Sequence, residues 1–180
     1  MNPVKRLLTY RYAEIIHDLT VEFVGLYINK FSRTKDQMEQ AARSGKQNIV
    51  EGVGQSQTSL KGLIKLLGVA KASLEELLSD YEDYLRQNKL EIYPRQDSRV
   101  TTFRQTTFRL SNLSNLSHLG NLIEKPKLPD NPQDAANFLL TLCHQATFLL
   151  HRQIESAERK FISEGGVSER LFKQRLKSRD

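Results

Sequence analysis

Positively charged side chains are concentrated in two stretches of the chain, one around residues 43–65 and one at the C-terminal end. Ammonium and guanidinium groups bind phosphate oxygens, and few aromatic residues alternate with these cations, so phosphate contacts are expected rather than base stacking. The alternative is a solvated basic helix end that complements the helix dipole. The candidate nucleic-acid contacts are Arg43, Lys46, Lys61, Lys65, Arg159, Lys160, Arg170, Lys173, Arg175, Lys177 and Arg179.

A second group of polar residues interrupts an apolar stripe in the same region. Arg43, Asn48 and Glu51 lie within just over two helical turns and predict a structural polar cluster that fixes the register between helices or subunits. Direct contact with a ligand is the alternative. Small residues accompany the cluster and predict close helix approach, because glycine is otherwise unfavourable inside a helix: Ala41, Ala42, Gly45, Gly52 and Gly54.

The remaining reactive side chains do not form a catalytic or metal-binding pattern. Helical di-metal sites pair Glu with a His three residues later on two helices, and that spacing does not occur. Cys143 lies on an apolar stripe without a neighbouring base, which indicates packing. We therefore expect no catalytic residue, no metal and no cofactor, and a solvated or intersubunit role for the carboxylates. The residues considered are Glu75, Glu76, Asp80, Glu82, Asp83, His17, His118, His144 and His151.

Composition indicates one main globular domain with a basic C-terminal half. Residues 1–97 carry 14 Lys/Arg against 13 Asp/Glu, whereas residues 98–180 carry 13 against 8. A basic excess favours a polyanionic partner. A single cysteine excludes an internal disulfide, and the N-terminal segment lacks the long apolar run of a signal peptide or membrane span, so a cytoplasmic location is expected.

Apolar residues recur at helical spacings almost throughout, which predicts an all-α fold. We expect an antiparallel four-helix bundle with an inserted helix and a short C-terminal helical extension. Residues 1–163 form the core, including the inserted segment 98–131, and residues 164–180 form a basic extension. The predicted stripes are Leu8, Tyr12, Ile15, Leu19, Phe23 and Leu26; Met38, Ala42, Gly45, Ile49 and Gly52; Leu60, Leu63, Leu67, Ala70, Leu74, Leu77, Tyr81 and Tyr84; and Ala136, Leu139, Cys143, Ala146, Leu150, Ile154, Ala157 and Phe161.

Helix boundaries are predicted by local capping residues. Thr34 with Gln37 forms a capping-box pair at the start of the second helix. Asn131 and Pro132 predict the N-cap and first position of the last long helix, and Gly165 predicts its end. Residues 98–124 are expected to be helical, although leucines every three residues would spiral around such a helix.

Residues 42–55 and 67–77 together resemble a bacterial four-helix-bundle family. That family includes proteins encoded in intervening sequences of large-subunit ribosomal RNA genes and the accessory variability determinant of diversity-generating retroelements. Residues 136–175 resemble the extension of its suffix-bearing branch. Lys71-Ala72 and the insertion at 98–124 depart from the pattern. The shared residues are Arg43, Ser44, Asn48, Ile49, Glu51, Gly52, Ala70, Ser73 and Glu76.

The resemblance implies a homo-oligomer, a pentamer, whose basic surface binds nucleic acid or a reverse transcriptase. The leading hypothesis is therefore a non-enzymatic nucleic-acid-binding accessory protein that could serve a reverse transcriptase. The alternative is a protein-interaction scaffold without direct nucleic-acid contact, and an enzyme with a site in the bundle core is a third hypothesis with little support.

Overall fold

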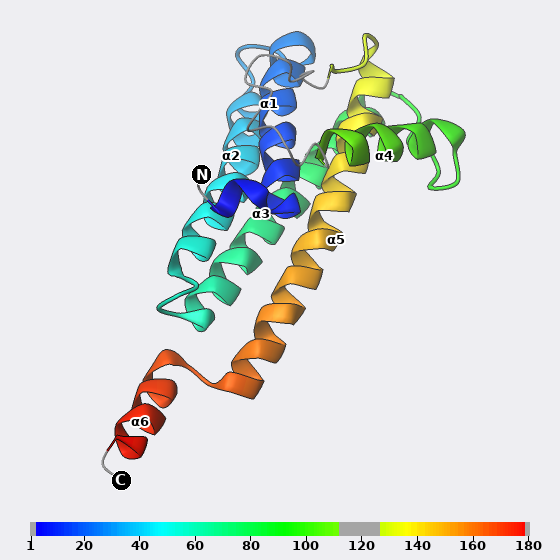
Figure 1. The fold of residues 1–180 in the computed structure, drawn as a ribbon. Coiled ribbons are helices and arrows are strands. Elements are labelled where there is room, and N and C mark those ends of the chain that lie inside the picture. The colour runs from blue at the N-terminus through cyan, green and yellow to red at the C-terminus, as the bar shows by residue number, and fades with distance from the viewer. Residues whose placement is uncertain (1–2, 112–126, 179–180) are drawn as a thin grey trace, which may run out of the picture.

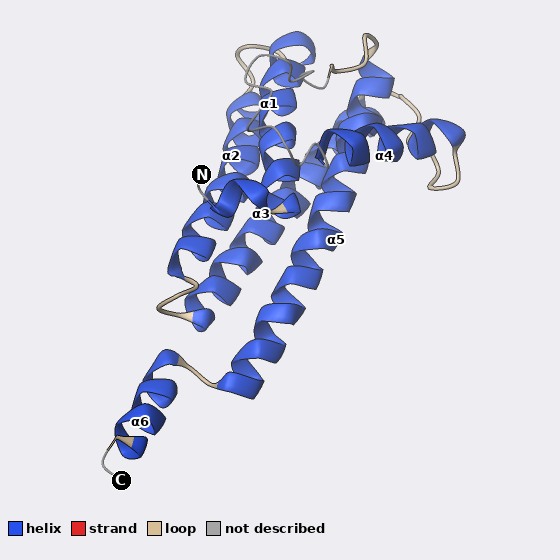
Figure 2. Cartoon of the chain, in the orientation of Figure 1, coloured by secondary structure: helices blue, strands red, loops and turns tan. Residues whose placement is uncertain are grey.

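The computed structural model describes residues 3–111 and 127–178. Within these ranges the chain forms six α-helices and no strand (Figure 2). A short 3₁₀ helix at Pro3–Arg6 precedes the first of them. The α-helices are α1 (Leu8–Tyr27), α2 (Arg33–Gln55), α3 (Leu60–Gln87), α4 (Ser98–Ser111), α5 (Pro132–Glu164) and α6 (Val167–Lys177).

Four of the helices close into a bundle. Helix α1 packs on α2, α2 on α3, α3 on α5 and α5 on α1, so each of the four has two neighbours. Neighbouring helices run in opposite directions, and α4 lies across the outside of α5, while α6 extends beyond the far end of the bundle (Figure 1). The predicted all-α, antiparallel four-helix bundle with an inserted helix and a C-terminal helix is therefore confirmed.

Helix α3 is the central element because its apolar stripe is unbroken. Leu67, Leu74 and Tyr81 are fully buried, as the predicted stripe requires, and α3 packs on both α2 and α5. The hydroxyl of Tyr81 shares a hydrogen bond with Thr20 Oγ1 at 2.9 Å, which satisfies its one polar group inside the core. The helix begins after Ser59, whose Oγ accepts a hydrogen bond from the Gly62 N–H at 2.9 Å.

The predicted stripe of α1 is only partly correct. Tyr12, Leu19 and Phe23 are buried, but Leu8 is 38% and Leu26 is 62% exposed. The buried face is instead completed by the residues beside the stripe: Ala13, Ile16, Thr20 and Val24. The buried face of α1 is broad because this helix packs against both α2 and α5.

The helix boundaries test the capping predictions. The capping box at Thr34 is wrong, since Ser32 is the N-cap of α2 and its Oγ accepts from the Thr34 N–H at 3.2 Å. Asn131 caps α5 as predicted, accepting from the Asp134 N–H at 2.7 Å. Gly165 ends α5 with a φ of 73°, a conformation that favours glycine. Of the expected helix at 98–124, residues 98–111 form α4, and residues 112–124 lie outside the described ranges.

No helix in the described parts of the chain is both long enough and apolar enough to cross a bilayer.

Candidate nucleic-acid interface

Two basic groups that are far apart in the sequence meet at one end of the bundle. The turn between α2 and α3 lies beside the C-terminal half of α5, and a groove of about 520 Å³ runs between them. Leu60 lines one side of this groove and Lys160 the other, so Lys61 and Lys65 of α3 occupy the same end as Arg159 and Lys160 of α5 (Figure 1). The remaining groove-lining residues are Ser56, Gln57, Leu63, Gln153, Ser156 and Ala157.

The positive charge at this end is not neutralised by ion pairs among the residues that the structure describes. Lys61, Lys65, Arg159 and Lys160 are exposed, and none of them forms an ion pair with another described residue. Lys61 stands in the first turn of α3, where the helix dipole already supplies positive potential. A basic residue in that position does not complement the dipole, which weakens the explanation of these lysines as helix-end charges.

Helix α6 lies beyond the same end of the bundle. Gly165 and Gly166 separate it from α5, and it projects away from the bundle (Figure 1). Arg175 is exposed on this helix, whose remaining predicted cations are Arg170, Lys173 and Lys177. Arg179 lies outside the described residues.

Arg43 and Lys46 lie away from that end, midway along α2. The Lys46 Nζ is 3.0 Å from Nδ1 of His17 on α1. Burial lowers the pKa of His17, and the nearby charges of Lys46 and Arg43 lower it further, while Asp18 opposes this shift. A neutral His17 can accept a hydrogen bond from the lysine ammonium, so Lys46 is directed toward α1 and not toward the groove.

The structure does not bring the three residues of the predicted polar cluster together. Asn48 Nδ2 donates to Ser44 O at 2.9 Å and to Ser44 Oγ at 3.1 Å, and Ser44 Oγ is 3.0 Å from Ser73 Oγ on α3. Arg43 and Glu51 are exposed instead. The polar contact between α2 and α3 is therefore Ser44–Asn48–Ser73, because only this side of α2 faces its neighbour.

The predicted close approach of α2 to α3 depends on two of the three glycines. A Cβ added at Gly45 would lie 2.7 Å from Leu74 Cδ2, and one added at Gly52 would lie 3.2 Å from Leu66 Cβ. Gly54, in contrast, has open space around its Cα, so packing does not require a glycine there.

The carboxylates of α3 occupy the half of that helix remote from the groove. Glu75 pairs with Lys71, and Asp83 pairs with Arg86 at 2.7 Å. Burial raises the pKa of Asp80 to about 6, with further increases from Glu76 and Asp83, and its Oδ2 is buried with no hydrogen-bond partner among the described residues. Within residues 3–111 and 127–178, no three His, Cys, Asp or Glu side chains are grouped so that they could hold a metal ion.

The remaining thiol and histidines are dispersed. Cys143 is fully buried in the core, and burial raises the pKa of its thiol far above the usual range. A protonated thiol without access to solvent is not a nucleophile. His151 lies 3.5 Å from Glu155 on the same helix, and His118 falls outside the described residues.

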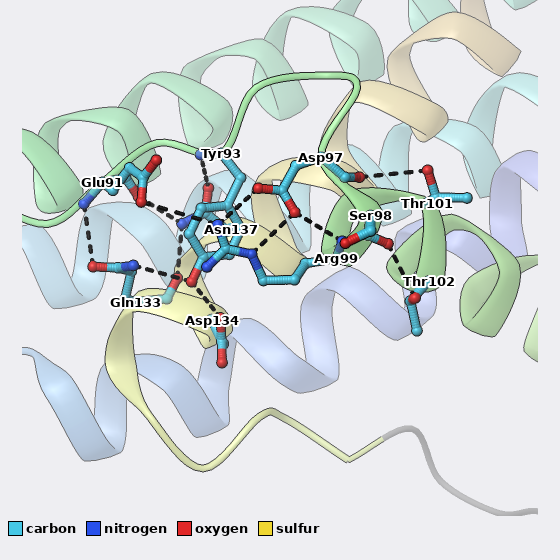
Figure 3. A network of polar contacts seen from close by, with 10 residues as sticks. All are labelled: Glu91, Tyr93, Asp97, Ser98, Arg99, Thr101, Thr102, Gln133, Asp134 and Asn137. Carbon is cyan, nitrogen blue, oxygen red and sulfur yellow. Dashed lines mark hydrogen bonds and ion pairs between the residues drawn. The ribbon is translucent and has the colours of Figure 1, made fainter.

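One network of polar contacts was not predicted from the sequence. It ties the loop between α3 and α4 to the start of α5 (Figure 3). Asn137 is 2% exposed; its Oδ1 accepts from the Tyr93 N–H at 2.8 Å, and its Nδ2 donates to Glu91 O at 2.9 Å. The Tyr93 hydroxyl donates to Asp134, and the guanidinium of Arg99 lies 3.5 Å from the Tyr93 ring centre. Pro94, which cannot continue a helix, is the sequence feature that marks this loop.

Comparison with known proteins gives no relative from which a function could be transferred. No family model matches the chain, and neither the curated proteins nor the solved structures contain a match.

Proposed function

We propose that this protein is a non-enzymatic, homo-oligomeric accessory protein that binds nucleic acid mainly through phosphate contacts. The observation that carries the proposal is that Lys61, Lys65, Arg159 and Lys160 are exposed at one end of the bundle and form no ion pair with another described residue. Exposed cations without a partner attract polyanions and release condensed counterions when they contact phosphates.

The chemistry of this end suits a phosphate backbone better than individual bases. The groove at this end is lined by Lys160 and by hydroxyl and amide side chains, including Ser56, Gln57 and Ser156, which can donate to phosphate oxygens. The exposed rings of Phe148 and Phe108 lie elsewhere on the molecule, whereas that of Phe172 lies on α6 at this end. Binding is therefore proposed to depend strongly on salt and weakly on sequence.

The assembly and partner are proposed from the resemblance of residues 42–55 and 67–77 to the bacterial four-helix-bundle family. On that basis the protein forms a pentamer and assists a reverse transcriptase. A ring of subunits would repeat the basic end of each bundle and multiply the number of phosphate contacts.

The proposal is tested by measuring binding to labelled single- and double-stranded RNA and DNA over a range of salt concentrations. The double variant Lys61→Glu/Lys160→Glu is expected to lower the affinity by more than about tenfold and to reduce the slope of log K against log salt by about 2. Lys30→Glu is the matched control, because Lys30 is exposed in the turn at the opposite end of the bundle. No binding at low salt, or equal losses in both variants, would contradict the proposal.

A protein-interaction scaffold is the second candidate function, and the apolar surface of α6 favours it. Leu171, Phe172 and Leu176 are each about half exposed or more. Exposed apolar groups of this size mark interaction surfaces. The triple change Lys173→Glu, Arg175→Glu and Lys177→Glu distinguishes the two functions, since it should abolish nucleic-acid binding in the first and leave partner binding intact in the second.

A further inference from the structure

A second cleft lies at the other end of the molecule, between the loop that follows α3, helix α4 and helix α5. Its volume is about 570 Å³, within the range of small-molecule sites in proteins. The loop contributes Ile92, Tyr93 and Arg95, helix α4 contributes Val100 and Arg104, and Glu82 lies on the adjoining side of α3. The residues contributed by α5 are Asn137, Leu140, Thr141, His144, Gln145 and Phe148.

Two arginines and one carboxylate, Glu82, line this cleft. Neither Arg95, which is exposed, nor Arg104, which is partly buried, forms an ion pair or a hydrogen bond with another described residue. A guanidinium that is removed from water normally has a carboxylate or phosphate partner. His144 is close to both arginines: burial lowers its pKa, Glu82 opposes this, and the charges of Arg104 and Arg95 lower it further. The cleft is therefore equipped to receive an anion.

The same cleft offers an apolar surface beside its charged groups. Gln145 also lines the cleft, but its Oε1 is buried and is not open to a ligand there. Phe148 and Ile92 both line the cleft and are 63% and 44% exposed. A planar group can stack on the exposed ring of Phe148.

The loop wall of the cleft is held in place before any ligand arrives. Asn137, whose side chain is almost fully buried, fixes the backbone on both sides of Ile92 through its hydrogen bonds to Glu91 and Tyr93 (Figure 3). Asp97 accepts from the backbone N–H of Arg99 at 2.8 Å and from its guanidinium, which attaches the loop to the start of α4 (Figure 3). A preformed wall reduces the entropy lost when a ligand binds.

We propose that this cleft binds a mononucleotide. The phosphate lies on Arg104 and Arg95, and the base packs on Phe148. The two cationic side chains and the exposed aromatic ring each require a different part of a nucleotide, and a simple anion or a simple aromatic compound would satisfy only one of them. The site is separate from the basic end and does not depend on the proposed nucleic-acid function.

The test is calorimetric titration of the full-length protein with adenosine 5′-monophosphate, adenosine, inorganic phosphate and a short single-stranded RNA. The monophosphate is expected to bind at least about tenfold more tightly than adenosine or phosphate alone. Arg104→Gln and Phe148→Ala should each weaken its binding by about tenfold. Arg152→Gln is the matched control, because Arg152 lies on α5 outside the cleft, paired with Glu155 at 3.6 Å.

Circular dichroism of each variant establishes that it is folded before binding is compared. The proposal is overturned if the monophosphate does not bind, if only the RNA binds, or if Arg104→Gln and Arg152→Gln have equal effects. It is also overturned if Phe148 is protected from solvent in the ligand-free protein because a second copy covers it, which hydroxyl-radical footprinting of the side chain detects.

Discussion

Asp80 has an incompletely satisfied carboxylate in a bundle whose other buried polar groups are largely hydrogen-bonded. Burial raises its pKa to about 6, and Glu76 and Asp83 add to the shift, because they disfavour a further negative charge on the same side of α3. Its Oδ2 has no hydrogen-bond donor among the described residues. The folded protein therefore binds a proton at Asp80 more tightly than the unfolded chain does.

This shift predicts a pH-dependent stability. Since the pKa of Asp80 in the folded protein lies above its ordinary value of 3.8, the stability contributed by the protonated form is complete below pH 3.8 and is lost as the pH rises through about 6. Asp80→Asn should match the wild type at pH 3.8 and be more stable above pH 7, by about 1 kcal/mol after allowance for solvent screening. Urea unfolding at several pH values measures the difference, and a Cγ chemical-shift titration with a midpoint near 4 would contradict it.

The contact between α2 and α3 depends on the absence of side chains at particular positions. Gly45 lies against Leu74, and an added Cβ would approach Leu74 Cδ2 to 2.7 Å and Cγ to 2.9 Å. Gly68, in the interior of α3, has no atom within 4 Å of its virtual Cβ. Both glycines have the same low helix propensity relative to alanine. Comparing their alanine substitutions therefore separates the effect of helix propensity on stability from the effect of packing.

Alanine at these two positions should therefore change stability in opposite directions. Gly68→Ala should raise the free energy of unfolding by up to about 1 kcal/mol through helix propensity alone. Gly45→Ala gains the same propensity, but Leu74 is fully buried and must move, so a net loss of about 1–2 kcal/mol is expected. Thermal and urea denaturation followed at 222 nm compare the two, and a stabilised Gly45→Ala would show that the helices can separate without penalty.

The helices themselves were predictable where a single local pattern determines them. The stripe of α3 is unbroken from Leu60 to Tyr81, and Asn131 with Pro132 defines the start of α5. At α2, both Ser32 and Thr34 could cap the helix, and the extended backbone of Ser32, with φ −78° and ψ 132°, identifies the N-cap only in the structure. The exposed ends of the α1 stripe depend on which neighbours cover that helix, which periodicity does not specify.

The candidate sites were predictable only in part, because they combine segments whose relative positions follow from the whole fold. Lys61 and Lys160 are both conspicuous in the sequence, but nothing in it indicates that they lie at the same end. Arg43 and Glu51 are placed on the surface because the side of α2 that faces α3 is defined by Ser44 and Asn48. The cleft was missed entirely, since its lining is drawn from three helices and a loop without a shared motif.

Among the described helices, α6 is the one that gains little stability from packing against the rest of the chain. It is 11 residues long, and helices of that length are marginal in water without a packing partner. Its contacts with the other described helices are few, and Phe172 and Leu176 are 63% and 49% exposed. The helix therefore needs a surface outside this chain, and in a homo-oligomer that surface is another subunit.

A second copy of the chain is expected to cover the apolar side of α6, so Phe172→Ser/Leu176→Ser should shift the protein toward the monomer. Light scattering across a concentration series measures the mass, and hydrogen exchange of the α6 amides should accelerate in the same variant because the isolated helix is frayed. Phe108→Ser is the matched control, since Phe108 is 61% exposed on α4 and belongs to a different surface. A wild-type protein that remains monomeric at every concentration would remove both the expected contact and the proposed homo-oligomer.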